Sequence, residues 1–185
     1  MEKTLKENIA KTIQLSHEEY QQIEHYFVRE TYKKGNYLVE SGKTAPFEFF
    51  IVSGLVVASH LNDEGKKHIV QFAMEDNWIS DIQSFNTGCS TSIDIKCLEN
   101  TVLYSISYAD KEKLCALSKK MEFFFRKKSS ANNIVLQKRI LNFMCTNSKD
   151  RYEQFIKQYP KIQLRVSKKL MASYLGITTK TLGQI

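Results

Sequence analysis

The stretch from Ala109 to Tyr159 contains neither glycine nor proline. Because these two residues disfavour a helix most strongly, a stretch of this length without them predicts consecutive helices. The preceding stretch, from Thr31 to Ser107, has the opposite character, since β-branched and aromatic runs alternate with turn signals such as Ser53-Gly54. The runs read NYLVE, FEFFIVSG, LVVASHL, KHIVQFA, SIDIKCL and TVLYSIS. Short strands at this spacing are typical of an all-β sandwich or barrel, so the chain predicts an α+β fold.

The glycine-free stretch divides into a short helix, a long helix from about Lys120 to Thr146, and a second short helix. One side of the long helix is apolar, although the polar residues 127–133 interrupt it. Such an apolar side indicates a helix that packs against another protein surface but does not form a long coiled coil. Phe124, Val135 and Leu141 lie on it without enough local partners, so we predict that the helix pairs with its copy in a homodimer.

Residues 5–30, which precede the strands, are also predicted to be helical. Ser16 is suited to cap a helix there, with Glu19 three residues later. Apolar residues recur at roughly helical spacing, at Ile9, Ile13, Ile23 and Phe27. We therefore expect helices on both sides of the β-rich part.

The last segment, Lys161 to Ile185, has basic residues and no acidic one. Ser167 is a natural N-cap for a first helix, and Gly176 stands where a helix C-cap needs positive φ. Thr178 can then cap a second helix, from which Leu182 and Ile185 would face inward. This order of helix, glycine-containing turn and helix is typical of a helix-turn-helix, although an ordinary αα-corner has the same elements.

The charge of this segment favours DNA as its partner. The whole chain carries a formal net charge of +7, and a clustered basic surface indicates a polyanion. In a helix-turn-helix, the start of the second helix faces base edges and the first helix crosses the phosphates. We assign DNA contacts to Ser167, Lys168, Lys169, Thr178, Thr179, Lys180 and Gln184.

Composition excludes several classes of protein. The hydrophobic fraction of 42% supports a packed core. The sequence contains no run of about 18 apolar residues, so we predict no membrane span. The first residues lack the apolar stretch of a signal peptide, so we expect a cytoplasmic protein. The four cysteines, Cys89, Cys97, Cys115 and Cys145, lack metal-binding spacing, and we expect free thiols with Cys97 and Cys115 in the core.

No sequence motif indicates an enzyme, since a nucleophile elbow, a P-loop and a dinucleotide fingerprint are all lacking. His60 and His68 flank the turn LNDEGKK and would lie opposite each other across a hairpin with a three-residue loop, Asp63 to Gly65. No third ligand is evident, so we interpret them as a solvent-facing pair and predict no metal or other cofactor. A cupin-like metal enzyme remains an alternative.

The chain resembles the Crp/Fnr transcription regulators across nearly its whole length. The segment YKKGNYLVESGKTAPFEFFIVSGLVVASHLNDEGKKHIVQFAMEDNWISD follows the turn rhythm of that family's sensor domain, and VSKKLMASYLGITTKTLGQI is similar to its helix-turn-helix. The overall sequence pattern resembles most closely the divergent Crp-like regulators of Bacteroidetes. The resemblance implies a cyclic-nucleotide-binding-like β-roll (a double-stranded β-helix) with flanking helices, a long dimerisation helix and a C-terminal (winged) helix-turn-helix.

The segment DNWISDIQSFNTGCSTSID departs from the nucleotide cassette of that family. Ser80-Asp81 stands where the family has Gly-Glu, and Thr91-Ser92 stands where it has Arg-Ser or Arg-Thr. Threonine lacks the charge and the bidentate fork with which arginine holds a cyclic phosphate, so we predict that cyclic AMP is not bound. The cysteine cluster of an Fnr-type iron–sulfur sensor is also missing. The candidate ligand pocket comprises Trp78, Ser80, Asp81, Thr91 and Ser92.

These inferences predict a sensor domain over residues 1–118, a dimerisation helix over 119–147 and a DNA-binding domain over 148–185. In the family the recognition helix runs on past the position of Ile185, so we expect this domain to be incomplete at its C-terminus. The predicted function is a dimeric transcription regulator that binds a palindromic operator in double-stranded DNA and answers to an unidentified small-molecule effector. A β-roll protein that senses a ligand or serves as a scaffold, acting through protein partners alone, is the alternative.

Overall fold

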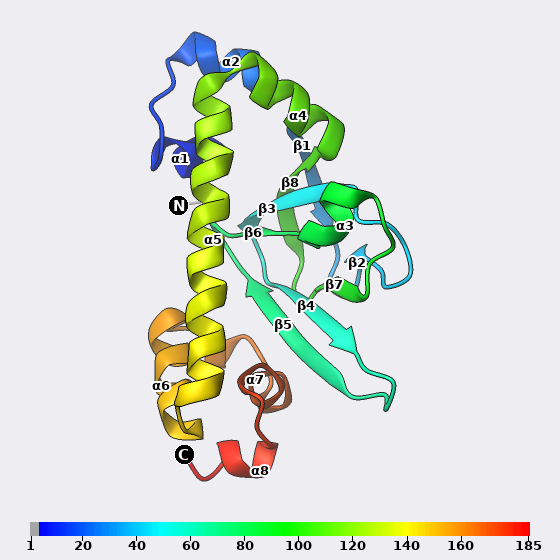
Figure 1. The fold of residues 1–185 in the computed structure, drawn as a ribbon, viewed down its shortest axis with the longest axis vertical. Helices are drawn as coiled ribbons and strands as arrows, with labels where there is room; N and C mark the ends of the chain where they lie inside the picture. Colours follow the sequence, from blue (N-terminus) through cyan, green and yellow to red (C-terminus); the bar gives the residue numbers. More distant parts are fainter. Residues whose placement is uncertain (1–3) are drawn as a thin grey trace.

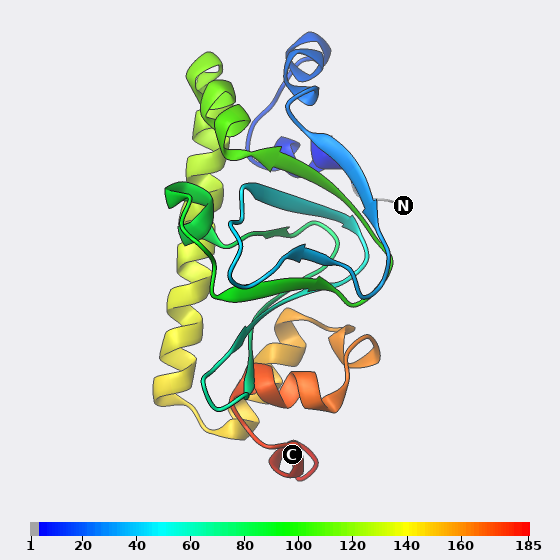
Figure 2. The same ribbon diagram turned by 90° about the vertical axis from the view of Figure 1, so that its right-hand side faces the viewer.

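The computed structural model describes residues 4–185. Eight strands form two four-stranded sheets, in the orders β1-β8-β3-β6 and β2-β7-β4-β5, and every paired strand is antiparallel. Figure 2 shows these strands wrapped around a common interior. The strands are β1 Val28–Tyr32, β2 Tyr37–Val39, β3 Phe47–Ser53, β4 Val56–Leu61, β5 Lys67–Ala73, β6 Trp78–Ile79, β7 Ile93–Cys97 and β8 Thr101–Ser107. The two inner faces meet in an aliphatic and aromatic core that includes Phe49, Ile51, Ile95 and Leu103.

Two short helices precede the roll, within the residues 5–30 that we predicted to be helical. They are α1, Leu5–Ala10, and α2, His17–Glu24. The predicted capping box is confirmed, since Ser16 and Glu19 exchange side-chain-to-backbone hydrogen bonds. The helical prediction is wrong beyond this helix, because Val28 begins a strand that pairs with β8.

One helix inside the β-rich part escaped the prediction. This is α3, Ile82–Thr87, which lies between β6 and β7. The Asp81 side chain accepts hydrogen bonds from the backbone amides of Gln83 and Ser84 at its start, and Gly88 ends it with φ of 70°. A capping aspartate and a glycine at the C-cap are both legible in the sequence, but the segment is too short to show helical periodicity.

Three helices occupy the glycine-free stretch, as predicted. They are α4, Tyr108–Leu117, α5, Lys119–Cys145, and α6, Ser148–Gln158. The long α5 runs along one side of the whole molecule (Figure 1). Its first turns are buried in a core with α1, α2 and β3, to which Met121, Phe124 and Phe125 contribute.

The C-terminal residues fold into the 3-10 turn η1, Ile162–Leu164, and the helices α7, Lys168–Leu175, and α8, Thr179–Leu182. The predicted caps are confirmed: Ser167 caps α7, Gly176 ends it with φ of 67°, and Thr178 caps α8. Leu182 is buried as expected, but Ile185 is 40% exposed, so its inward assignment is wrong. The reason is local, because α8 ends at Leu182 and leaves Ile185 outside the helix.

A third core joins these C-terminal helices to the roll. Phe72 of β5 stacks against Phe155 of α6 and Tyr174 of α7, with ring centroids 6.2 and 5.3 Å apart. Leu55 and Val57 contribute from the roll. The predicted division at residues 118 and 147 therefore separates segments that share a continuous apolar interior.

The cysteines are free thiols within residues 4–185, as expected. Cys97 is buried in the roll and Cys115 is half-buried beside the core under α5, whereas Cys89 and Cys145 are exposed. Burial raises the pKa of both Cys97 and Cys115. No helix in the described part of the chain is long and apolar enough to cross a membrane.

Candidate functional site

Two of the residues at the cassette positions of the roll, Asp81 and Thr91, bond to each other. The Thr91 hydroxyl donates a hydrogen bond to the Asp81 carboxylate, which also caps α3. The Ser80 hydroxyl donates to the Phe47 carbonyl at 2.7 Å, and the Ser92 carbonyl lies 2.8 Å from Nδ1 of His60. The structure thus brings Asp81 and Thr91 together and uses their polar atoms within the fold.

A bound cyclic phosphate would find no cation among these residues. Thr91 is only 4% exposed, and the sequence has no arginine or lysine between Lys67 and Lys96. Asp81 and Thr91 line neither the pocket beside Trp78 nor the pocket between α5, α6 and α7.

Trp78 lies elsewhere in the roll. Its indole nitrogen donates to the Asn8 side chain at 2.9 Å, and its ring packs against Phe50, Phe124 and Phe125. These contacts place the side chain between α1 and α5, on the wall of a pocket beneath α5. The Trp78 ring therefore contributes to the core under α5.

The residues assigned to DNA gather at the ends of α7 and α8. Lys168, Lys169, Thr179 and Lys180 are exposed, while the Ser167 and Thr178 side chains cap the two helices. None of the three lysines forms an ion pair with a carboxylate of residues 4–185. Gln184 is exposed but follows the end of α8, so it does not lie on the second helix.

Arg165 belongs to the fold, although the sequence groups it with the basic residues of the last segment. Its guanidinium donates to Glu75 at 2.8 and 3.0 Å and to Glu99 at 2.6 and 3.0 Å. These hydrogen bonds to Glu99 and Glu75 raise the pKa of Arg165. Because both carboxylates lie on the roll, the charge of Arg165 fastens the C-terminal helices to it and is not available to DNA.

Ser173 and Arg139 add further hydrogen bonds at this junction. The Ser173 hydroxyl donates to the Lys67 carbonyl at 2.7 Å and accepts from the Ile69 amide at 3.2 Å, so α7 is tied to the edge of β5. The Arg139 guanidinium of α5 donates to the backbone carbonyls of Val70, Ile69 and Tyr174. No sequence pattern indicated these long-range contacts.

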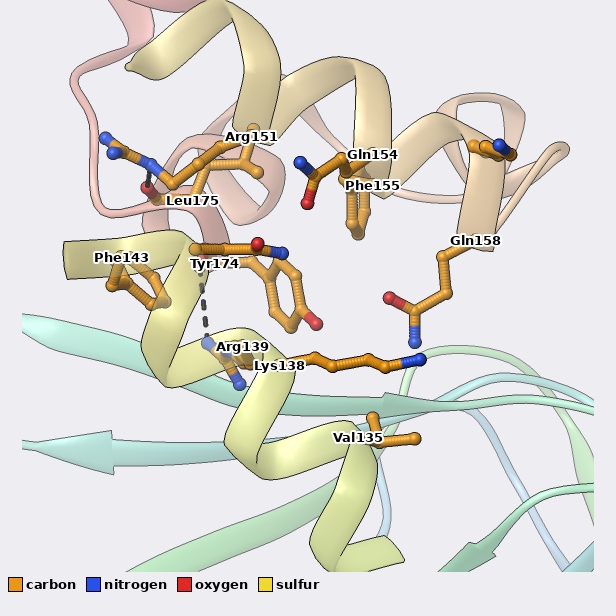
Figure 3. A pocket seen from close by; sticks show the side chains of 12 residues that line it. Val135, Lys138, Arg139, Phe143, Arg151, Gln154, Phe155, Gln158, Tyr174 and Leu175 are labelled. Atoms are coloured by element: carbon orange, nitrogen blue, oxygen red, sulfur yellow. Dashed lines mark hydrogen bonds between the residues drawn. The ribbon is translucent and has the colours of Figure 1, made fainter. Parts of the chain in front are cut away.

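A pocket of about 430 Å³ lies beside this junction, between α5, α6 and α7 (Figure 3). Arg139 and Phe143 line it from α5, Gln154 and Phe155 from α6, and Tyr174 from α7. It was not predicted, because the three helices that form it are brought together only by the third core.

The second half of α5 presents an apolar surface to solvent. Val135 and Leu141 are exposed, the latter at 53%, which agrees with their lack of local partners. Phe124 is 2% exposed and packs against Trp78 and Phe125, so its assignment to the unpartnered surface is wrong. The exposed apolar side chains of this half are Ile134, Val135, Leu136, Ile140, Leu141, Phe143 and Met144.

The histidine pair is placed as predicted. His60 and His68 are direct partners in the pairing of β4 with β5, and Asn62 and Lys66 close the loop 63–65. Within residues 4–185, no three histidine, cysteine or acidic side chains are grouped as a metal site would need.

Comparison with known proteins supports this architecture. Residues 29–118 match the family model described as the cyclic nucleotide-binding domain. No curated protein sequence matches the chain significantly. Among solved structures, FixK2 from Bradyrhizobium japonicum is similar with a TM-score of 0.74 at 15% identity, over 85% of this chain and 81% of its own.

Two further structures are similar along most of the chain. The c-di-GMP responsive global regulator CLP of Xanthomonas campestris has a TM-score of 0.71 at 13% identity, over 89% of this chain and 86% of its own. A protein from Eubacterium rectale assigned to the Crp/Fnr family of transcriptional regulators has a TM-score of 0.68 at 15% identity, over 92% and 81%. The fold shared with these regulators extends beyond the roll to the helices that follow it.

Proposed function

We propose that this chain is a dimeric, DNA-binding transcription regulator of the Crp/Fnr type, without catalytic activity, that works in the cytoplasm. The observation that carries the proposal is the pair α7 and α8. Each helix has a side-chain cap, the left-handed Gly176 separates them, and Lys168, Lys169 and Lys180 are exposed at their ends without a carboxylate partner in residues 4–185. Cap, glycine turn and second cap in this order support a helix-turn-helix.

The exposed half of α5 supports the dimer. Its apolar side chains recur along the helix at Ile134, Leu141 and Met144, and a second copy of the same helix would cover them. An isologous pair of this kind has twofold symmetry, which matches a palindromic operator.

The roll is proposed to respond to an effector other than cyclic AMP. Thr91 stands where the resemblance implies arginine, and its hydroxyl is already bonded to Asp81. Losing a charge-assisted bidentate contact costs on the order of 2–5 kcal/mol, enough to remove useful affinity. Calorimetry with cyclic AMP should therefore show no micromolar binding, and a micromolar dissociation constant would contradict this part of the proposal.

The test of DNA binding is selection of duplexes from a random pool by the purified chain. We expect enrichment of an inverted repeat whose half-sites lie about one helical turn apart, roughly 10 base pairs between centres. A pool that stays unenriched would contradict the proposal and favour action through protein partners alone.

A further inference from the structure

The pocket between α5, α6 and α7 is large enough for a small molecule. Its volume of about 430 Å³ falls within the range of ordinary ligand sites. Apolar side chains form part of the wall, chiefly Phe143, Phe155, Tyr174 and Leu175. Figure 3 shows the Tyr174 ring between Arg139 and the side chains of α6.

The charged side chains of the lining all have one sign. Lys138 and Arg139 come from α5, and Arg151 and Lys157 come from α6, whereas no aspartate or glutamate lines the pocket. None of these four cations forms an ion pair with a carboxylate of residues 4–185. Arg165, a short distance along the chain, shows the contrast, because two carboxylates neutralise it.

The two guanidinium groups are held in place by neutral partners. Arg139 donates to backbone carbonyls and lies 4.0 Å from the centre of the Tyr174 ring, and burial lowers the pKa of its guanidinium. Arg151 donates to the carbonyls of Leu175 at 3.2 Å and Thr146 at 2.6 Å. Arginine stays charged under these conditions, so each group contributes a fixed positive charge in a partly desolvated setting.

The remaining polar residues of the lining are two lysines and three amides. Lys138 and Lys157 are exposed, and in Figure 3 the Lys138 side chain extends across the pocket toward Gln158. Asn142, Gln154 and Gln158 add amide groups that can donate hydrogen bonds to an oxyanion. The pocket thus combines an aromatic wall, fixed positive charge and exposed ammonium donors.

We propose that this pocket binds a small organic anion: a carboxylate or phosphate group carried on a flat apolar body. The apolar body packs against Tyr174 and Phe155, and Lys138 and Lys157 donate to the oxyanion. The site lies outside the roll and is separate from the surface proposed for DNA, so it goes beyond the proposed function. Because its walls come from α5, α6 and α7, an occupant would tie the C-terminal helices to the long helix.

The test uses calorimetry on the whole chain with four probes. These are 2-naphthoate, 1-naphthyl phosphate, inorganic phosphate and the neutral 2-naphthol. We expect at least one naphthyl anion to bind one per chain and at least about tenfold more tightly than 2-naphthol, a difference set by one charge-assisted contact. The two naphthyl anions distinguish a carboxylate ligand from a phosphate ligand, and inorganic phosphate reports what the oxyanion contributes alone.

The double variant Lys138→Gln, Lys157→Gln locates the binding. It should weaken binding of the naphthyl anion by about tenfold or more. Lys149→Gln, on the exposed start of α6 and outside the lining, should leave that affinity unchanged. Equal binding of 2-naphthol, no binding of either naphthyl anion, or an unchanged affinity in the double variant would each overturn the proposal. DNA takes no part in the measurement, so its result is independent of the proposed DNA binding.

Discussion

The two halves of α5 differ in what covers them. The first half is enclosed by its own chain, with Phe124 in the core and Lys128 hydrogen-bonded to Glu48 at 2.8 Å. The second half exposes Leu141 and carries Arg139, which has no carboxylate partner in residues 4–185. One continuous helix therefore holds the roll at one end and exposes an apolar surface at the other end.

Truncating an apolar side chain in each half should separate folding from dimerisation. Phe124→Ala should lower the free energy of unfolding by about 3–5 kcal/mol, because it leaves a cavity against Trp78 and Phe125. Urea denaturation measures this change. Leu141→Ala should shift the monomer–dimer equilibrium toward monomer at micromolar concentration, as light scattering would record. If Leu141→Ala left the dimer intact, the exposed half of α5 would not be the interface.

The ion pairs in the first half of α5 should contribute nearly as much to the free energy of unfolding as the Phe124 side chain does. Glu48 is buried on β3 and accepts from Lys111 of α4 at 3.0 Å and from Lys128 of α5. Burial by itself raises the pKa of Glu48, but these two ammonium groups outweigh it and lower the pKa. Glu48→Gln leaves two half-buried cations without a counter-charge and should cost about 3 kcal/mol in urea denaturation. The exposed Glu112→Gln on α4 is the matched control and should change stability by no more than about 0.5 kcal/mol.

Lys128 should make stability depend on pH in a defined window. Burial lowers its pKa from 10.5 to about 8, in spite of Glu48. Between these two values the unfolded chain binds more protons at this position than the folded chain, so its contribution to stability rises as the pH rises. The stability of the wild type relative to Lys128→Met should increase by roughly 1–3 kcal/mol from pH 8 to pH 10.5. A difference that stays constant or falls across that window would contradict the burial of this charge.

The smallest effects are expected from substitutions on α7 and α8, the helices that we propose bind DNA. Lys168→Ala should weaken binding to all DNA sequences alike. It should also reduce the slope of log affinity against log salt concentration by about one, because a phosphate contact releases about one counterion. Lys180→Ala, at the start of α8, should relax preference at one base pair by roughly 1–3 kcal/mol. Fluorescence anisotropy over a range of salt concentrations measures both, with Lys149→Ala as the control. A change of sequence preference in Lys168→Ala alone would reverse the assignment of the two helices.

Features that depend on a few neighbouring residues were predicted better than features that depend on contacts between distant residues. Ser16, Ser167, Gly176 and Thr178 mark helix ends through contacts within a few residues, and the structure confirms each of them. Short elements with no room for periodicity, such as α3, were missed.

Contacts between distant residues explain the wrong assignments. Phe124 was taken as unpartnered because its neighbours Trp78 and Phe50 lie on strands far away in the sequence. Arg165 lies in the basic last segment, and its partners Glu75 and Glu99 are brought to it only by the fold. The pocket between α5, α6 and α7 depends on the same long-range packing.

The central claim is that two copies of this chain, joined through the exposed half of α5, bind one DNA site. Native mass spectrometry of the chain with a duplex selected from the random pool tests it directly. We expect two chains per duplex, and Leu141→Glu, which places a charge in the apolar surface, should abolish that species while the chain stays folded. One chain per duplex in the wild type, or two chains per duplex in Leu141→Glu, would contradict the account.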